Sequence, residues 1–357
     1  MTKWEYTETE LWRYGEEGTS IFHVFGTIAV DTTVLVFAEA RYGDGSDAGC
    51  AHDIVMRKSA DGGKTFLKQK MLLSSEKKCC WVNPVPLYDH EIKRMFLFFA
   101  ENFDNKRTQC YTIFSDDLGE SWSDAQNLTN VLDTSFSLPG PGHGICLQNG
   151  GHKGRLLVPF WHRDKGVEAP SAERGYRVSC LYSDDHGESW SRSDFYGREM
   201  QANESRLAEC GDSIFWSVRT RGNYQGCSRS FNGGDVFSVF EKLPLPLAKN
   251  CDIGVVSLCE KGICENMLLM SRVSHTDKRR DMEIRISYDG GQSFPDAFAL
   301  MKGDAMPGYS DLCVICESEP IVGMVHCRNN HVLFSRISLQ TLTGGKLDRT
   351  TRSVWLE

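Results

Sequence analysis

Long apolar runs are missing from this chain of 357 residues, and so are dense basic segments. No stretch of eighteen apolar residues occurs, so no membrane-spanning helix is predicted. Lysine and arginine together number 40 against 48 acidic residues, and the clusters at 77–78 and 278–280 are too short to form a basic patch. With a formal net charge of −8, the composition argues against a nucleic-acid partner.

The patterns of common metal and cofactor sites are also missing. His52, His143, His152 and His162 lie in different segments without ligand spacing, so we expect no catalytic metal. The glycines at 43–45 are not followed by a helical pattern, so no phosphate-binding loop is predicted. Nothing else in the sequence implies a cofactor.

Cysteine is sparse for a disulfide scaffold, with 14 positions in the whole chain. Cys313 and Cys316 have C-x-x-C spacing, but no second pair lies at zinc-site distance, which favours core packing over a metal or redox role. The first ten residues are polar and acidic and contain no apolar leader segment. We therefore expect a cytoplasmic protein with reduced thiols, while a secreted form trimmed of its leader remains an alternative.

What the sequence does contain is an internal repeat. The pattern Ser-x-Asp-x-Gly-x-Ser/Thr-aromatic occurs five times, and in the fourth copy Asn232 and Val236 replace the Asp and the hydroxyl residue. The Asp accepts hydrogen bonds from its own turn, and the Gly supplies a backbone with positive φ. These turns are structural, so their aspartates are not expected to be catalytic. The copies occupy residues 59–66, 115–122, 183–190, 230–237 and 287–294.

The residues before each copy are β-branched and aromatic, as at 111–114 and 283–286, which is typical of a turn between antiparallel strands. Successive copies begin about 50 to 70 residues apart, which leaves room for four short strands. The apolar runs at 32–38 and 331–337 would build or close a further blade. The sequence therefore predicts an all-β fold, a six-bladed β-propeller of four-stranded antiparallel blades, as a single domain over residues 1–357.

Repeated Asp-box turns of this form, on a chain of this size, resemble those of the exo-sialidase (neuraminidase) family. The unrepeated segments between the turns are similar to that family and follow its order. These segments are residues 34–41 with 46–47, residues 140–144 with 154–159, and residues 203–205, 215–219, 280–285 and 308–312.

The resemblance implies a retaining exo-glycosidase that hydrolyses terminal sialic acid, or a closely related keto-acid sugar, from glycoconjugates. It implies that Tyr309 is the nucleophile, Glu204 its base and Asp47 the acid/base. A neutral tyrosine suits this substrate, because an anionic nucleophile would approach the carboxylate on the anomeric carbon against charge repulsion.

The resemblance also implies a set of arginines that hold the substrate. Arg41 matches a pocket arginine, and Arg219 and Arg280 match residues that grip the carboxylate through charge-assisted hydrogen bonds. Arg279 competes with Arg280 for the last position. Trp161 and the adjacent His162 end an apolar run and are further candidates for the pocket lining.

The sequence departs from the family pattern at His23, which stands where the first of three gripping arginines is expected. Loss of one such contact weakens carboxylate binding by roughly 1.5–3 kcal/mol. Three interpretations follow: a sialidase with a two-arginine grip, a glycoside hydrolase for a different sugar, or a non-catalytic carbohydrate-binding propeller. The presence of Asp47, Glu204 and Tyr309 together favours catalysis.

Overall fold

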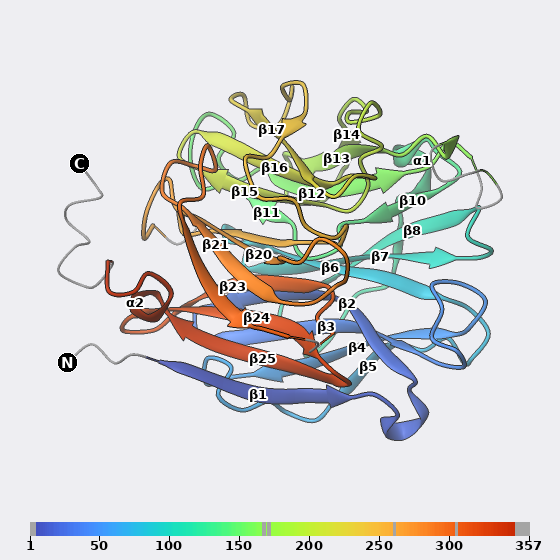
Figure 1. Ribbon diagram of the computed structural model, residues 1–357. Coiled ribbons are helices and arrows are strands. Elements are labelled where there is room, and N and C mark those ends of the chain that lie inside the picture. Colours follow the sequence, from blue (N-terminus) through green and yellow to red (C-terminus); the bar gives the residue numbers. More distant parts are fainter. Residues whose placement is uncertain (1–4, 166–168, 170–172, 260–261, 304–305, 347–357) are drawn as a thin grey trace.

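The computed structural model describes residues 5–165, 169, 173–259, 262–303 and 306–346 (Figure 1). In these ranges the strands form six antiparallel sheets that follow one another around a ring. The prediction of an all-β, six-bladed propeller is confirmed.

Strands that follow one another in the chain pair within each blade, except that two short strands of the third blade both pair with the same neighbour. The last blade also receives the N-terminal strand. The first blade contains β2 (Ile21–Val30), β3 (Thr33–Arg41), β4 (His52–Ser59) and β5 (Lys70–Leu73). The second blade contains β6 (Trp81–Asp89), β7 (Arg94–Asn102), β8 (Thr108–Ser115) and β9 (Gln126–Asn127). The third blade contains β10 (Ser137–Pro139), β11 (Ile145–Cys146), β12 (Leu156–His162), β13 (Arg177–Ser183) and β14 (Ser191–Arg192). The fourth blade contains β15 (Ser205–Cys210), β16 (Ser213–Arg219), β17 (Gln225–Ser230) and β18 (Glu241–Lys242). The fifth blade contains β19 (Gly254–Ser257), β20 (Leu268–Val273), β21 (Met282–Ser287) and β22 (Asp296–Met301). The last blade contains β23 (Ser310–Cys316), β24 (Pro320–Arg328), β25 (His331–Ser338) and β1 (Tyr6–Arg13).

The ring is closed by strand β1, which pairs antiparallel with β25 and so completes the last blade (Figure 1). The register runs from Tyr6 opposite Ile337 to Arg13 opposite His331. The predicted run at 331–337 lies in β25 and takes part in this closure. The run at 32–38 lies mostly in β3, the second strand of the first blade.

Each repeated turn joins the last two strands of its blade, as the first copy illustrates between β4 and β5. The Ser59 hydroxyl donates to Asp61 Oδ1 at 2.7 Å and accepts from the Gly63 amide at 2.8 Å. The Thr65 amide and hydroxyl donate to the two carboxylate oxygens of Asp61 at 2.9 and 2.6 Å. The last blade takes its fourth strand from the N-terminus, so no turn of this kind is needed there.

The turn glycine also holds adjacent blades together. At Gly63 φ is +81°, and a Cβ would lie 2.3 Å from the Phe334 ring of the preceding blade. At Gly187 φ is +86°, and a Cβ would lie 2.5 Å from Phe96 of the blade before it. The Gly is therefore required both for its backbone conformation and for this close approach.

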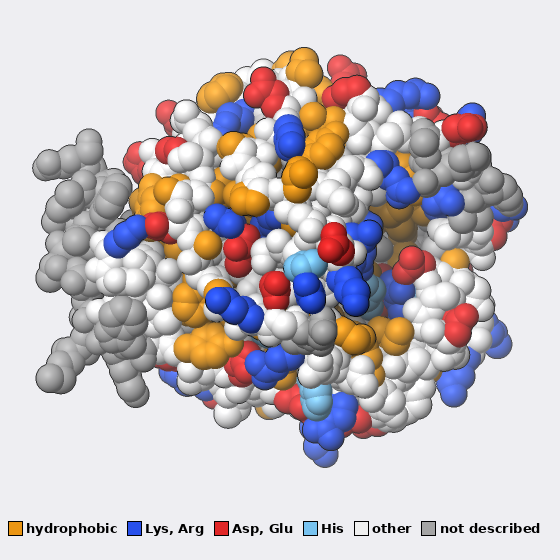
Figure 2. Space-filling view, viewed as in Figure 1, with side chains coloured by type: hydrophobic (Ala, Val, Ile, Leu, Met, Phe, Trp, Pro, Cys, Tyr) orange, Lys and Arg blue, Asp and Glu red, His pale blue; other side chains and the backbone are white. Residues whose placement is uncertain are grey.

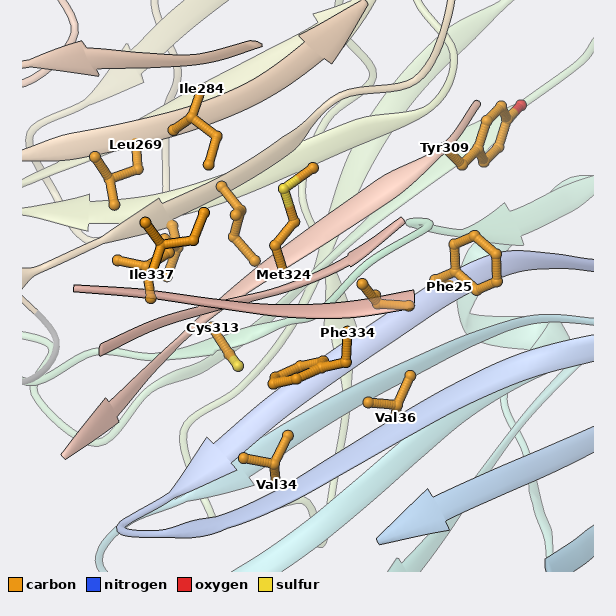
Figure 3. Packing of buried hydrophobic residues seen from close by; sticks show 14 of the residues in the cluster. Phe25, Val34, Val36, Leu269, Ile284, Tyr309, Cys313, Met324, Phe334 and Ile337 are labelled. Atoms are coloured by element: carbon orange, nitrogen blue, oxygen red, sulfur yellow. The ribbon is translucent and has the colours of Figure 1, made fainter. Parts of the chain in front are cut away.

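Strand β3 shows how the blades share their cores. Its residues from Val34 to Ala38 are fully buried, because another blade packs on each face of the sheet. Val34 and Val36 point into one interblade core together with Phe334 and Ile337 (Figure 3). Leu35 and Phe37 point into the core on the opposite face of the sheet. A strand buried on both faces reads as a continuous apolar run, as this segment does.

The helices in the described part of the chain are single turns: η1 (Glu16–Gly18), α1 (Thr129–Leu132) and α2 (Leu339–Leu342). None of the helices found there has the length and apolar character needed to cross a membrane. All 14 cysteines lie within the described ranges, and none of them forms a disulfide bond.

Candidate active site

A pocket of about 290 Å³ opens where strand ends and loops of several blades meet. Strands β7 and β12 run toward the right of Figure 1, and on that side Figure 2 shows a hollow beside which Lys and Arg side chains gather. The pocket brings together most of the residues selected from the sequence, namely His23, Arg41, Asp47, Trp161, Glu204, Arg219 and Tyr309.

Tyr309 and Glu204 form the centre of the site. The Tyr309 hydroxyl donates a short hydrogen bond to Glu204 Oε1, and Arg219 Nη1 donates to Glu204 Oε2 at 2.5 Å and to the Tyr309 oxygen at 2.9 Å. Burial raises the pKa of Tyr309 well above its ordinary value, and the charge of Glu204 adds to this shift. The phenol is therefore neutral and already in contact with a carboxylate that can accept its proton.

The aromatic ring of Tyr309 belongs to the large interblade core, while its oxygen points away from the other labelled side chains (Figure 3). Tyr309 directly precedes β23, whose Asp311 is fully buried. Asp311 accepts from the Thr27 amide at 2.8 Å and lies 3.0 Å from His143 Nδ1. These contacts fix the strand that carries the phenol. His143 was not predicted to take part, because nothing in its local sequence indicates a partner 168 residues away.

Asp47 lies in the exposed loop between β3 and β4, and Arg41 at the end of β3 holds it. Arg41 Nη1 donates to Asp47 Oδ1 at 2.6 Å, and Arg41 Nε donates to the buried Glu39 at 2.7 Å. Partial desolvation raises the pKa of Asp47, but the charge and hydrogen bond of Arg41 outweigh this and hold the pKa below its ordinary value. The loop thus places a carboxyl group at the rim of the pocket.

His23 is aimed at the pocket by a β-bulge in β2, where the pairing shifts between His23 and Gly26 and Val24 has φ of +51°. Its ring lies against Tyr309, with the two ring centroids 4.6 Å apart. Burial lowers the pKa of His23 to about 3, and the nearby arginines, Arg41 foremost, add to this shift. The ring is therefore neutral at ordinary pH and does not replace the charge of an arginine.

Arg280, which the sequence predicts as a pocket arginine, is not among the described residues that line the pocket. The described part of the pocket is lined by its neighbour Arg279, whose guanidinium carbon lies 5.7 Å from the centroid of the Tyr309 ring. Arg280 instead contacts the His275 side chain. Both residues lie in the loop between β20 and β21, where strand alternation no longer determines which side chain faces the site.

Several lining residues were missed at the level of sequence: Arg163, Arg174, Tyr176 and Arg221. They lie in loops outside the repeat and outside the segments that resembled the family, so no pattern marked them. Trp161 lines the pocket as suggested. His162 points elsewhere and is buried between Ser137 and Ser179, 2.8 Å from each hydroxyl.

The pocket is strongly basic although the whole chain is acidic. The described residues that line it include three carboxylates, Glu39, Asp47 and Glu204, and six arginines, Arg41, Arg163, Arg174, Arg219, Arg221 and Arg279. Neither in the pocket nor in the rest of the described ranges is a group of three or more His, Cys, Asp or Glu side chains placed to hold a metal ion. The arrangement suits an anionic ligand and offers it a neutral nucleophile with a base beside it.

Comparison with known proteins matches the chain to a family described as "BNR repeat-like domain", over residues 32–327. A sialidase of Micromonospora viridifaciens is 24% identical over 95% of this chain and 55% of that protein. A sialidase of Bacteroides fragilis is 24% identical over 92% of this chain and 64% of that protein. The chain thus spans between one half and two thirds of these relatives.

Among solved structures, the Hadza microbial sialidase Hz136 superposes with a TM-score of 0.79 at 22% identity. The match covers 92% of this chain and 68% of that one. Together with the sequence relatives, it confirms the resemblance to sialidases and the propeller fold.

Proposed function

The chain belongs to the BNR repeat-like domain family, and from this membership and the chemistry of the pocket we propose that it is a retaining exo-sialidase. Its substrate would be terminal sialic acid, or a closely related 2-keto-acid sugar, on a glycoconjugate. The observation on which the proposal depends is the hydrogen bond between Tyr309 and Glu204, which both line a pocket rich in arginine.

In the first step, the Tyr309 oxygen attacks the anomeric carbon while Glu204 takes the phenolic proton. The bond to the leaving oxygen breaks, and Asp47 gives that oxygen a proton. Because Arg41 favours the ionised form of Asp47, Asp47 must first take up a proton from solvent as its hydrogen bond to Arg41 loosens, and it then gives this proton to the leaving oxygen.

In the second step, Asp47 takes a proton from a water molecule, and the water oxygen attacks the same carbon. Tyr309 then leaves and recovers its proton from Glu204. Two displacements at one carbon give net retention of configuration. Throughout, Arg219 and Arg279 would hold the substrate carboxylate, with His23 as a neutral neighbour.

Release of the aryl group from an aryl α-sialoside tests this proposal. Tyr309→Phe removes only the nucleophilic oxygen, so we expect turnover to fall by roughly a hundredfold or more. Tyr111→Phe is the matched control, because that hydroxyl lies on β8 and contacts Gln109 away from the pocket. NMR of the first-formed sugar anomer tests retention, and an inverted first product would contradict the mechanism.

A carbohydrate-binding propeller without turnover is the second candidate, and the neutral His23 in the expected place of an arginine favours it. Calorimetric binding of a sialoside without product formation would support this candidate. Turnover that depends on Tyr309 would contradict it.

A further inference from the structure

One wall of the pocket carries arginines for which the proposed mechanism has no role. Arg163 directly follows β12, Arg174 and Tyr176 precede β13, and Arg221 follows β16. All of them line the pocket, and we refer to these four residues as the arginine wall.

Tyr176 links the members of the arginine wall. Its hydroxyl accepts from Arg174 Nη1 at 3.2 Å, and the guanidinium carbon of Arg221 lies 5.8 Å from its ring centroid. Tyr176 itself is 5% exposed, which limits its movement. The guanidinium groups are therefore arranged around a rigid aromatic side chain.

Arg163 is the most informative member, because its charge is buried. It is 4% exposed, its guanidinium carbon lies 3.5 Å from the centroid of the Phe136 ring, and its Nη2 donates to the backbone and side-chain oxygens of Asn105 at 2.7 and 2.8 Å. None of these partners is charged, and burial lowers the pKa of Arg163 to about 10. Among the described residues, the carboxylate of Asp47 acts on Arg163 through its charge, but it is already paired with Arg41. An anionic ligand beside Arg163 would therefore lower the cost of burying this cation.

The carboxylates of the pocket are already engaged on its other side. Glu39 and Asp47 pair with Arg41, and Glu204 pairs with Arg219. Over the described lining residues, six guanidinium groups stand against three carboxylates, a formal excess of three positive charges. A substrate with a single carboxylate would balance one of these three charges.

We propose that the arginine wall binds a second anionic group of the substrate. The preferred substrate would then be a 2-keto-acid glycoside that also carries a carboxylate, sulfate or phosphate. Guanidinium groups suit such oxyanions because their N–H groups can form paired hydrogen bonds with two oxygens. The inference rests on the proposed function for the reacting end of the substrate. The second oxyanion has two possible sources, the side chain of the sugar itself or the aglycone.

Three glycosides with a common reacting end separate these sources. They are an α-sialoside with a neutral aglycone, the same sialoside with a sulfated sugar as aglycone, and a keto-acid glycoside whose side chain ends in a second carboxylate. We expect kcat/KM for one doubly anionic glycoside to exceed that of the neutral-aglycone sialoside by about tenfold or more. The doubly anionic glycoside with the higher kcat/KM identifies the source of the second oxyanion.

Arg221→Gln is the primary variant, because Arg221 is exposed and the substitution does not disturb the core. It should reduce the preference for the doubly anionic glycoside by about tenfold. This preference is the ratio of its kcat/KM to the kcat/KM of the neutral-aglycone sialoside. Arg163→Gln should reduce it as well, provided that circular dichroism shows a folded protein. Arg13→Gln is the matched control and should leave the ratio unchanged, since Arg13 lies on β1 and pairs with Glu10.

Calorimetry of the same glycosides with Tyr309→Phe provides a readout that does not depend on turnover. Equal kcat/KM values for all three glycosides, unaffected by Arg221→Gln, would overturn the inference and leave the proposed function standing. Absence of turnover with every glycoside, while Tyr309→Phe still binds the doubly anionic one more tightly, would overturn the proposed function and leave the second anion site standing.

Discussion

At the scale of single residues, we expect His23 to determine how the pocket binds the carboxylate of the proposed substrate. Its ring packs on Tyr309 and is neutral, because burial and neighbouring arginines lower its pKa to about 3. A neutral imidazole can offer one hydrogen bond, whereas a guanidinium would offer two together with a charge. We therefore expect this position to limit the affinity for a simple sialoside.

His23→Arg should raise kcat/KM for an aryl α-sialoside by about tenfold, the factor that one charge-assisted hydrogen bond provides. His23→Asn is the matched control, since it keeps a neutral donor and should give no increase. The measurement is initial-rate kinetics on the three proteins, with folding checked by circular dichroism. A fall in activity with His23→Arg would mean that His23 serves a different sugar.

One physical reason explains why several pocket residues could not be identified from the sequence. Arg279 and Arg280 are adjacent in an irregular loop, and only the folded backbone determines which one faces Tyr309. Arg163 and Arg221 follow strand ends in different blades, and the ring brings them together. By contrast, Glu204 was identifiable because it lies in a segment whose order and composition resembled a known family.

At the scale of elements, the repeated turns differ in one hydrogen bond. In the third copy the Ser189 hydroxyl donates to Asp185 Oδ2 at 2.5 Å. In the fourth copy Asn232 Oδ1 accepts from the Val236 amide at 3.1 Å, and the valine has no hydroxyl to donate. The Val236 side chain is 60% exposed, so it contributes little to the core.

Restoring the missing pair with Asn232→Asp and Val236→Ser should raise the free energy of unfolding by about 1 kcal/mol, the net contribution of one such hydrogen bond. Urea denaturation of the double variant and of each single variant forms a double-mutant cycle. We expect a favourable coupling between the two substitutions. Effects of the single variants that merely add up would contradict this account of the turn.

These turns also explain why the architecture was predictable from the sequence. The hydrogen bonds of Asp61 and the positive φ of Gly63 depend only on neighbours within the turn, so each copy marks one junction between strands. Strand β1 has no such signal. Its partner β25 lies more than 300 residues away, and nothing local in residues 6–13 indicates that pairing.

At the scale of the whole molecule, closing the ring buries neutral histidines in several blades. Burial lowers the pKa of His23 on β2 to about 3 and of His326 on β24 to about 4, and lowers the pKa of His162 on β12 well below its ordinary value. In the unfolded chain such histidines bind protons near pH 6.5. Below that pH the unfolded state binds protons that the folded state does not bind, so a fall in pH favours unfolding.

The free energy of unfolding should therefore fall as the pH drops from about 6.5 toward 4, by about 1.4 kcal/mol per pH unit for each such histidine. The turn carboxylates act in a lower window. Burial raises the pKa of Asp61, but hydrogen bonds from Thr65, Ser59 and the Lys64 backbone together outweigh this and lower the pKa to about 2. Their stabilising contribution is lost only below about pH 4, as they become protonated in the folded state.

Urea unfolding at several pH values between about 7 and 5 measures this slope, and His326→Gln identifies its source. The His326 Nε2 lies 2.8 Å from the Ser335 hydroxyl, a contact that the glutamine amide can keep, while the titrating ring is gone. The slope should decrease by about one proton. Ser335→Ala is the matched control, because it removes the same contact without removing a titratable group, and it should lower stability at every pH without changing the slope. A slope unaffected by His326→Gln would show that acid destabilisation has its origin outside this buried histidine.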